Sequence, residues 1–237
     1  MVVELINVCG HTFVKDFLGA TPSVIDCGAN YGAFATCLAK EHLATVYGFE
    51  PDPRLFPMLP ELENVTFFNS AVSGSGADLI LNLGEEKCSS AYFSEGAGQT
   101  AVTVKSTKLN DFCNEKKLNK IDLLKLDIEG AEIEVLEKLP PEFLAAIGQI
   151  TVEFHDFLDK AELPRIQSAV RRVKACDFYF VKLSHHDYSD CLFINTKTHP
   201  VGSVAKINFL FKKYYFGIKR ILKRHSESDK LDIGSDR

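Results

Sequence analysis

Short strand-like runs alternate with helix-like stretches along most of this 237-residue chain, and this alternation constrains its fold more than any other feature. The runs expected to form core strands are 23–26, 45–50, 65–72, 121–127 and 147–154. Helical patterns follow three of these runs. One lies at 31–42, one continues from the fourth strand to about Leu139, and one lies around 161–176. Strands that alternate with helices form parallel sheets that need helices on both faces. The sequence therefore predicts one α/β domain with a doubly wound, mostly parallel sheet.

Two segments depart from this alternation. Residues 73–107 are rich in Gly and Ser, and their strand-like pieces at 78–83 and 101–105 predict a β-hairpin excursion. Residues 178–183 and 191–195 are two strand-like runs joined by a polar loop. They predict a terminal antiparallel hairpin on the edge of the sheet.

Composition excludes several classes of function. The net charge of -5 and the absence of an N-P-P-Y-type tetrapeptide argue against a nucleic-acid substrate. The seven cysteines are odd in number, have no C-x-x-C spacing and follow no leader-like start, so we expect reduced thiols and a cytoplasmic protein. The sequence contains no apolar run of the ~18 residues that a membrane span needs.

The most informative turn follows the first strand and runs from Asp26 to Gly32 as D-C-G-A-N-Y-G. Ligands of open α/β sheets bind beyond the carboxyl ends of the strands, where Gly28 would let the backbone approach a ligand and Gly32 would let the next helix pack closely. The spacing is not the G-x-G-x-x-G that binds a pyrophosphate. An aspartate and two glycines after a strand are, by themselves, more often ordinary turn chemistry than a ligand site.

Glu50 closes the second strand, where a carboxylate can accept both ribose hydroxyls. A lone glutamate at a strand end is usually only solvated. Here the glycine turn and the glutamate follow one another at the ends of two successive strands, and this arrangement favours a ligand site. After the third strand, Asn69, Ser70 and Ala71 form a small polar turn that suits an adenine edge. Together these features indicate an adenosine ligand without a diphosphate, and S-adenosylmethionine is the common one.

Several motifs resemble those of the FkbM-type family of class I S-adenosylmethionine-dependent methyltransferases. They are VIDCGANYGAF at 24–34, FEPDP at 49–53, VTVKSTKL at 102–109, IDLLKLDIEGAE at 121–132 and VEFH at 152–155. The resemblance covers about residues 22–195. It implies a Rossmann-like class I methyltransferase fold with S-adenosylmethionine as the methyl donor.

The resemblance also implies roles for individual residues. The cofactor-binding residues would be Asp26, Gly28, Asn30, Gly32 and Glu50, with Ser70 and Ala71 near the adenine and Ser89 and Ser90 near the acceptor. Family members methylate hydroxyl groups, so the expected acceptor is a hydroxyl of a sugar, glycolipid or small natural product. Two alternatives remain open: methylation of a nitrogen or carboxyl group, and a catalytically degenerate module that binds a cofactor or partner.

A hydroxyl acceptor must lose a proton, so a base or a metal should lie beside it. The candidates are Asp127, Glu129, Glu132, Glu153 and His155, all near the carboxyl ends of the fourth and fifth strands. Asp127, Glu153 and His155 are the expected catalytic residues, because Glu153 and His155 are two apart and point the same way on a strand. They could form a general-base pair or a hard-cation site for Mg²⁺.

Structural roles are also open for these acidic and histidine residues. Glu129 and Glu132 could only favour the helix dipole, and Glu153 could pair with Lys125 across adjacent strands. His185 and His186 lie in the terminal hairpin loop, where a solvated turn is favoured over contact with an acceptor.

The chain is expected to divide into a methyltransferase domain at 1–200, a basic amphipathic helix at 201–225 and a polar, disordered tail at 226–237. Residues 203–225 carry seven Lys or Arg residues and no acid, interleaved with aromatic and aliphatic side chains. Such a helix suits peripheral contact with an anionic membrane surface. It equally suits a helix that docks on the domain and keeps its lysines in water.

Overall fold

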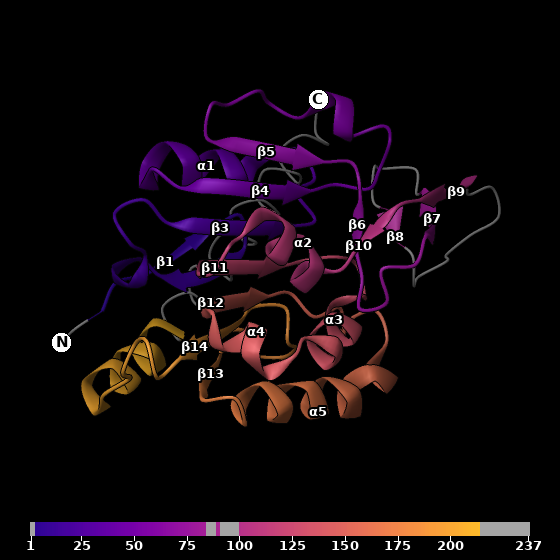
Figure 1. Ribbon diagram of the computed structural model, residues 1–237. Coiled ribbons are helices and arrows are strands. Elements are labelled where there is room, and N and C mark those ends of the chain that lie inside the picture. Colours follow the sequence, from indigo (N-terminus) through magenta and orange to yellow (C-terminus); the bar gives the residue numbers. More distant parts are fainter. Residues whose placement is uncertain (1–2, 84–88, 91–99, 214–237) are drawn as a thin grey trace, which may run out of the picture.

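A seven-stranded sheet with the order β13-β14-β12-β11-β3-β4-β5 forms the centre of the computed structural model, which describes residues 3–83, 89–90 and 100–213 (Figure 1). Its strands are β3 (Ser23–Cys27), β4 (Thr45–Phe49), β5 (Val65–Phe68), β11 (Ile121–Leu126), β12 (Ile147–Val152), β13 (Phe178–Lys182) and β14 (Cys191–Asn195). Adjacent strands from β12 to β5 pair in parallel, whereas β14 is antiparallel to β12 and β13. This confirms the predicted doubly wound sheet and its terminal hairpin.

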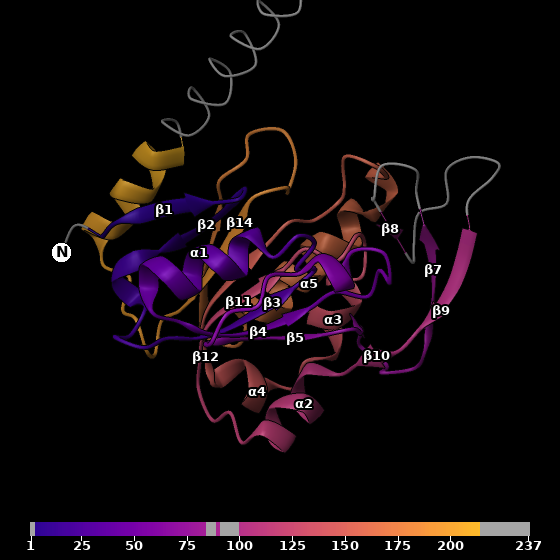
Figure 2. The ribbon, with the colours of Figure 1, turned by 90° about the horizontal axis from the view of Figure 1, so that it is seen from above.

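Helices cover both faces of the sheet, as Figure 2 shows from above. The helix α1 (Ala33–His42) packs on one face together with the hairpin of β1 (Leu5–Val8) and β2 (His11–Val14). The opposite face carries α2 (Leu109–Lys116), α3 (Glu132–Lys138), α4 (Pro141–Ala145) and α5 (Leu163–Lys174). Short 3₁₀ turns lie at Lys15–Phe17, Phe56–Met58 and Lys160–Glu162.

Local sequence explains the elements that frame the site. Every residue of β11 and β12 is buried, as expected for central strands of a parallel sheet covered on both faces, although each strand carries two polar or charged residues. In α5 the buried residues are Ile166, Ala169, Val170 and Val173, at the spacing that places one helical face on the core. Pro141 opens α4 at a position where its missing N–H costs no helical hydrogen bond.

The expected third strand, 65–72, is divided. After β5 the chain turns at Ser70, whose N–H bonds to the carbonyl of Phe68, and β6 (Ala71–Val72) leaves the main sheet. There β6 pairs in parallel with β10 (Ser106–Thr107). The expected excursion lies between them and forms a small antiparallel sheet of β8 (Ser89–Ser90), β7 (Leu79–Leu83) and β9 (Thr100–Val104).

Residues 203–213 are helical and dock on the domain through the buried side chains of Ala205 and Phe209. The rest of the expected basic helix, 214–225, and the expected disordered tail at 226–237 lie outside the described residues. Within the described ranges, the structure contains no helix that is both long enough and apolar enough to cross a membrane.

Candidate active site

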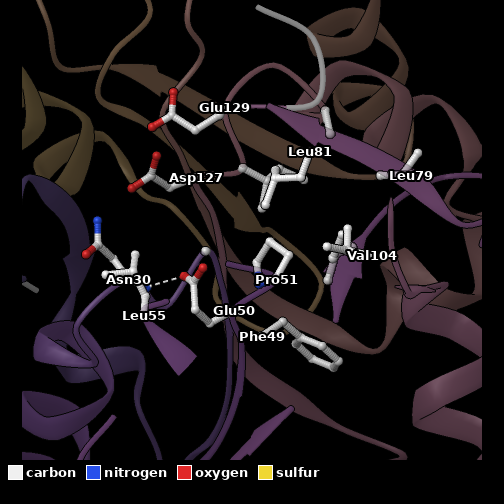
Figure 3. Close-up of a pocket in the computed structure, with 15 residues that line it drawn as sticks. Asn30, Phe49, Glu50, Pro51, Leu55, Leu79, Leu81, Val104, Asp127 and Glu129 are labelled. Carbon is white, nitrogen blue, oxygen red and sulfur yellow. Dashed lines mark hydrogen bonds between the residues drawn. The ribbon is translucent and has the colours of Figure 1, made fainter. Parts of the chain in front are cut away.

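A cavity opens at the carboxyl ends of β3, β4 and β11 (Figure 3), and about 780 Å³ of space free of protein atoms lies in it and in the solvent at its mouth. Its polar lining consists of Asn30, Glu50, Asp127 and Glu129 beside the backbone of Gly28. Its apolar lining consists of Phe49, Pro51, Leu55, Ala71, Val72, Leu79, Leu81, Val104, Ile128 and Ala131. The small sheet of β7 and β9 therefore supplies one apolar wall, a role that the sequence patterns did not reveal.

The loop after β3 brings its backbone directly against the loop after β11. Gly28 has φ +81°, and a Cβ atom added there would lie 1.8 Å from the carbonyl oxygen of Asp127. Only glycine fits this close approach. Asn30 is also left-handed, with φ 51°, and lines the cavity. Gly32 has φ +73° and packs against Pro60 and Phe67, so it supports the start of α1 outside the cavity lining.

Glu50 is 5% exposed and points its carboxylate into the cavity, as Figure 3 shows. The backbone N–H of Asn30 donates to one oxygen at 2.7 Å, and the N–H of Asp52 donates to the other at 2.8 Å. Burial raises the pKa of Glu50 to about 7, against the opposing effect of these two N–H donors. The acidic side chain is thus fixed at the cavity edge with free lone pairs for a hydroxyl donor.

Asp26 and Ser70, both expected to bind the cofactor, do not line the cavity. Asp26 is fully buried near the end of β3. Ser70 makes a 2.8 Å hydroxyl contact with Thr107 and donates to the carbonyl of Lys105, so it joins β6 to β10. Its neighbour Ala71 does line the cavity.

Lys125 does not pair with Glu153, so that structural alternative is wrong. In the β-sheet register Lys125 lies beside Asp26 on β3. Its Nζ is 3.0 Å from Asp26 Oδ1 and 3.6 Å from Asp127 Oδ2, and it donates to the carbonyl of Gly28 at 2.7 Å. Burial would lower the pKa of Lys125, but Asp26 and Asp127 raise it above its usual value. Lys125 is therefore a buried cation that holds both cavity loops.

Asp127 is surrounded by positive and titratable groups. Its Oδ2 lies 3.2 Å from His11 Nε2, and its Oδ1 lies 3.7 Å from His155 Nε2. Burial alone would raise the pKa of Asp127, but Lys125 and then His11 lower it below its usual range. Asp127 consequently stays ionised at neutral pH, with its side chain 27% exposed.

Glu153 and His155 both lie close to Asp127. Ligand-type atoms of His11, Asp127 and Glu153 lie within 4.8 Å of one another, as do those of Asp127, Glu132 and His155. Burial, and then the charge of Asp127, raises the pKa of Glu153 to about 7. Burial would lower the pKa of His155, but Glu132 and Glu129 raise it to about 9. Near neutral pH, Glu153 is the group able to accept a proton and His155 is a cation.

Glu132 does more than favour the dipole of α3. It is 1% exposed and accepts the N–H of Ile128 at 2.7 Å and that of Gly130 at 3.1 Å. It also lies 3.2 Å from His155 Nδ1. Glu129, which has φ 54° in the same tight loop, lines the cavity and lies 3.3 Å from His155 Nε2. The I-E-G-A-E segment thus builds the rim of the cavity.

His11 was not expected at the site, because the N-terminal segment carries no recognisable motif. It begins β2, is 2% exposed and packs edge-on against Phe34 at 5.7 Å between ring centroids. His185 and His186 are exposed in the loop between β13 and β14, as a solvated turn requires, and Ser89–Ser90 forms β8.

Comparisons with known proteins identify the family of this chain. The Methyltransferase FkbM domain model matches residues 26–189. Methyltransferase sdnD of Sordaria araneosa is 28% identical over 183 residues, which cover 60% of this chain and 70% of the relative. Hexuronic acid methyltransferase AglP of Haloferax volcanii is 24% identical over 151 residues, covering 62% and 61%.

A third relative, 2-O-methyltransferase NoeI of Sinorhizobium fredii, is 28% identical over 136 residues, covering 48% of this chain and 56% of its own length. These matches thus span between 56% and 70% of the relatives' lengths. Among solved structures, the fibrillarin pre-rRNA processing protein of Methanococcus jannaschii gives a TM-score of 0.44 at 15% identity, covering 81% of this chain and 69% of that one. The family model matches residues 26–189, which is more than half of this chain, and the sheet has the order of a class I methyltransferase fold. The chain therefore belongs to the FkbM methyltransferase family.

Proposed function

We propose that this protein transfers a methyl group from S-adenosylmethionine to a hydroxyl of a sugar, glycolipid or small natural product. The observation that carries the proposal is the cavity beside Glu50, which is apolar on the side of β7 and β9 and acidic on the side of Asp127. An adenine suits the apolar side, and ribose hydroxyls suit the Glu50 carboxylate.

The residues present fit this cofactor in charge as well as in shape. When bound, S-adenosylmethionine supplies a methyl group on a positively charged sulfur. Asp127 is ionised and lines the cavity, so it offers a negative charge to that cation. Gly28, which has no side chain to collide with the Asp127 carbonyl, lets the loop after β3 lie against the loop after β11 at the cavity.

Glu153 is the proposed general base. The acceptor oxygen gains the methyl group and loses its proton, and Glu153 accepts that proton because its pKa of about 7 matches the working pH. His155 is proposed to act by position: as a cation, it holds Asp127 and Glu129 at the cavity rim. His11 constrains Asp127 through its other carboxylate oxygen.

The acceptor class rests on the names of the relatives. AglP is named for a hexuronic acid and NoeI for 2-O-methylation, which favours a sugar hydroxyl over a nitrogen or carboxyl acceptor. Mg²⁺ at the cluster of His11, Asp127 and Glu153 is a second candidate for activating the hydroxyl, because these ligand atoms lie within 4.8 Å of one another. Activity after removal of divalent ions distinguishes the two routes.

Calorimetric titration with S-adenosylmethionine and S-adenosylhomocysteine tests the cofactor. Wild type should bind both, and Glu50→Gln should weaken binding by roughly tenfold or more, since it loses a charged acceptor for the ribose hydroxyls. Glu61→Gln, at an exposed glutamate outside the cavity, is the matched control. Folded wild type that binds neither ligand would overturn the proposal and favour a degenerate partner-binding module.

A further inference from the structure

The helical segment 203–213 has a docked face. Ala205 is 5% exposed and Phe209 is 1% exposed, and the Phe209 ring lies 6.1 Å from that of Tyr179 on β13. The side-chain amide of Asn208 donates to the carbonyl of Val3, and Lys206 Nζ lies 5.2 Å from the Tyr179 ring centroid. These contacts fix the rotation of the helix on the domain.

The same helix carries a second apolar face that points away from the domain. Val204 is 51% exposed, Ile207 54%, Leu210 60% and Phe211 71%. At 100° per residue these four side chains lie on the side opposite Ala205 and Phe209. They are four of the ten large apolar side chains that are exposed in the described part of the chain. Such concentration within eight residues marks an interaction surface rather than scattered surface apolar residues.

Charge indicates what this surface contacts. The segment 203–225 contains seven Lys or Arg residues and no Asp or Glu, in a chain whose net charge is -5. Lys206, Lys212 and Lys213 lie in the described part of the helix, off the exposed apolar stripe. An apolar stripe flanked by cations is complementary to a bilayer interface, where acyl chains lie beneath anionic headgroups.

We propose that this outer face, formed by Val204, Ile207, Leu210 and Phe211, seats the protein in the plane of an anionic phospholipid bilayer. The apolar side chains enter the headgroup–acyl boundary, and the positive charge of the segment attracts the anionic headgroups. The docked face remains on the domain, so the helix is a fixed attachment between the domain and the membrane surface. The two interpretations that the sequence leaves open, docking and membrane contact, are therefore properties of opposite faces of one helix.

The helical segment 203–213 lies at the opposite end of the molecule from the cavity. Figures 1 and 2 both show the segment near β1 and β14, away from β7 and β9. Membrane contact through this face leaves the cavity mouth uncovered. Lipid binding and methyl transfer to a water-soluble acceptor should consequently respond to different substitutions.

Vesicle co-sedimentation of the full chain tests the proposal. Vesicles of phosphatidylcholine mixed with phosphatidylglycerol should pellet wild type, and the Ile207→Ser/Phe211→Ser double variant should bind roughly tenfold more weakly or worse, since two apolar anchors are lost. Binding should fall on raising salt and on omitting phosphatidylglycerol. Met58→Ser, at an equally exposed apolar residue (54%) on another surface, should bind as wild type does.

Four outcomes would overturn the proposal. The double variant could bind these vesicles as tightly as wild type, which would put the contact elsewhere. Wild type could fail to pellet with them, or pellet equally with phosphatidylcholine alone. Light scattering could find a wild-type dimer that the double variant dissociates, which would make the face a contact between two copies of this chain. An unchanged melting temperature confirms that the double variant is folded.

Discussion

Lys125 of β11 lies beside Asp26 of β3 with its Nζ 3.0 Å from Oδ1, and the two side chains are 4% and 0% exposed. A buried ion pair is costly to form, but removing one partner leaves a charge without compensation. Because Lys125 also donates to the carbonyl of Gly28, the pair connects the protein core to the cavity loop. Asp26 therefore supports the cavity loop through Lys125 without lining the cavity itself.

Lys125→Met should therefore destabilise the fold by about 3–5 kcal/mol, measured by urea unfolding. Asp26→Asn combined with Lys125→Met should cost less than the sum of the single changes, because no buried carboxylate is left alone. Lys105→Met, which breaks the exposed pair with Asp78, is the control and should cost less than about 1 kcal/mol. Additive single and double effects would show that the buried pair is not coupled.

Gly28→Ala should disrupt the cavity loop. The added methyl group would lie 1.8 Å from the Asp127 carbonyl oxygen at a left-handed φ, so the backbone must move. We expect at least about 2 kcal/mol of destabilisation by thermal unfolding, together with loss of S-adenosylhomocysteine binding. Gly202→Ala is the control: no atom lies within 4 Å of its added Cβ, so stability and ligand binding should stay as in wild type. Normal ligand binding by Gly28→Ala would refute the close-approach argument.

The pH profile tests Glu153 as the base. With a folded-state pKa of about 7, its ionised fraction rises about tenfold between pH 6 and 8, and the methylation rate should rise with it. Glu153→Gln should lower kcat by roughly 10²-fold or more and flatten this rise. The exposed Glu142→Gln should retain the wild-type profile. A rise that persists in Glu153→Gln would assign the proton to another group.

His155 should make stability depend on pH in a defined window. Its pKa is raised from 6.5 to about 9 in the folded state, so its stabilising effect is complete below pH 6.5 and is lost as the pH rises through about 9. His155→Gln should therefore be most destabilising near about pH 6 and least near about pH 10. Chemical denaturation of both proteins across this range measures the difference, and a constant gap would contradict it.

Two phenylalanines on one helix should differ in how much their substitution lowers the unfolding free energy. Phe209→Ala removes a ring that is 1% exposed and should cost about 3 kcal/mol or more of unfolding free energy. Phe211→Ala removes one that is 71% exposed and should change stability by less than about 0.5 kcal/mol. Thermal and urea unfolding check both, and similar losses would mean that both faces of the helix are packed.

The nature of the sheet and the position of its ligand edge followed from local patterns. Buried runs such as 121–126 specify strands by themselves, and parallel strands bring their carboxyl ends to one edge. Gly28, Glu50 and Asp127 could therefore be expected at one place from their order along the chain alone. The turn at Ser70, which takes β6 out of the main sheet, has no such local signature.

The sequence by itself determined the core strands, the helices α1, α3 and α5 that follow three of them, the order of these elements and the chemistry available at the strand ends. Only the tertiary structure decided the partners: His11 reaches Asp127 across 116 positions, and Lys125 pairs with Asp26 rather than Glu153. It also decided that β7 and β9 form a cavity wall and that one helix has a docked and an exposed apolar face. Periodicity reports which side of an element is apolar, whereas the partner of a buried charge depends on strand register and packing between distant segments.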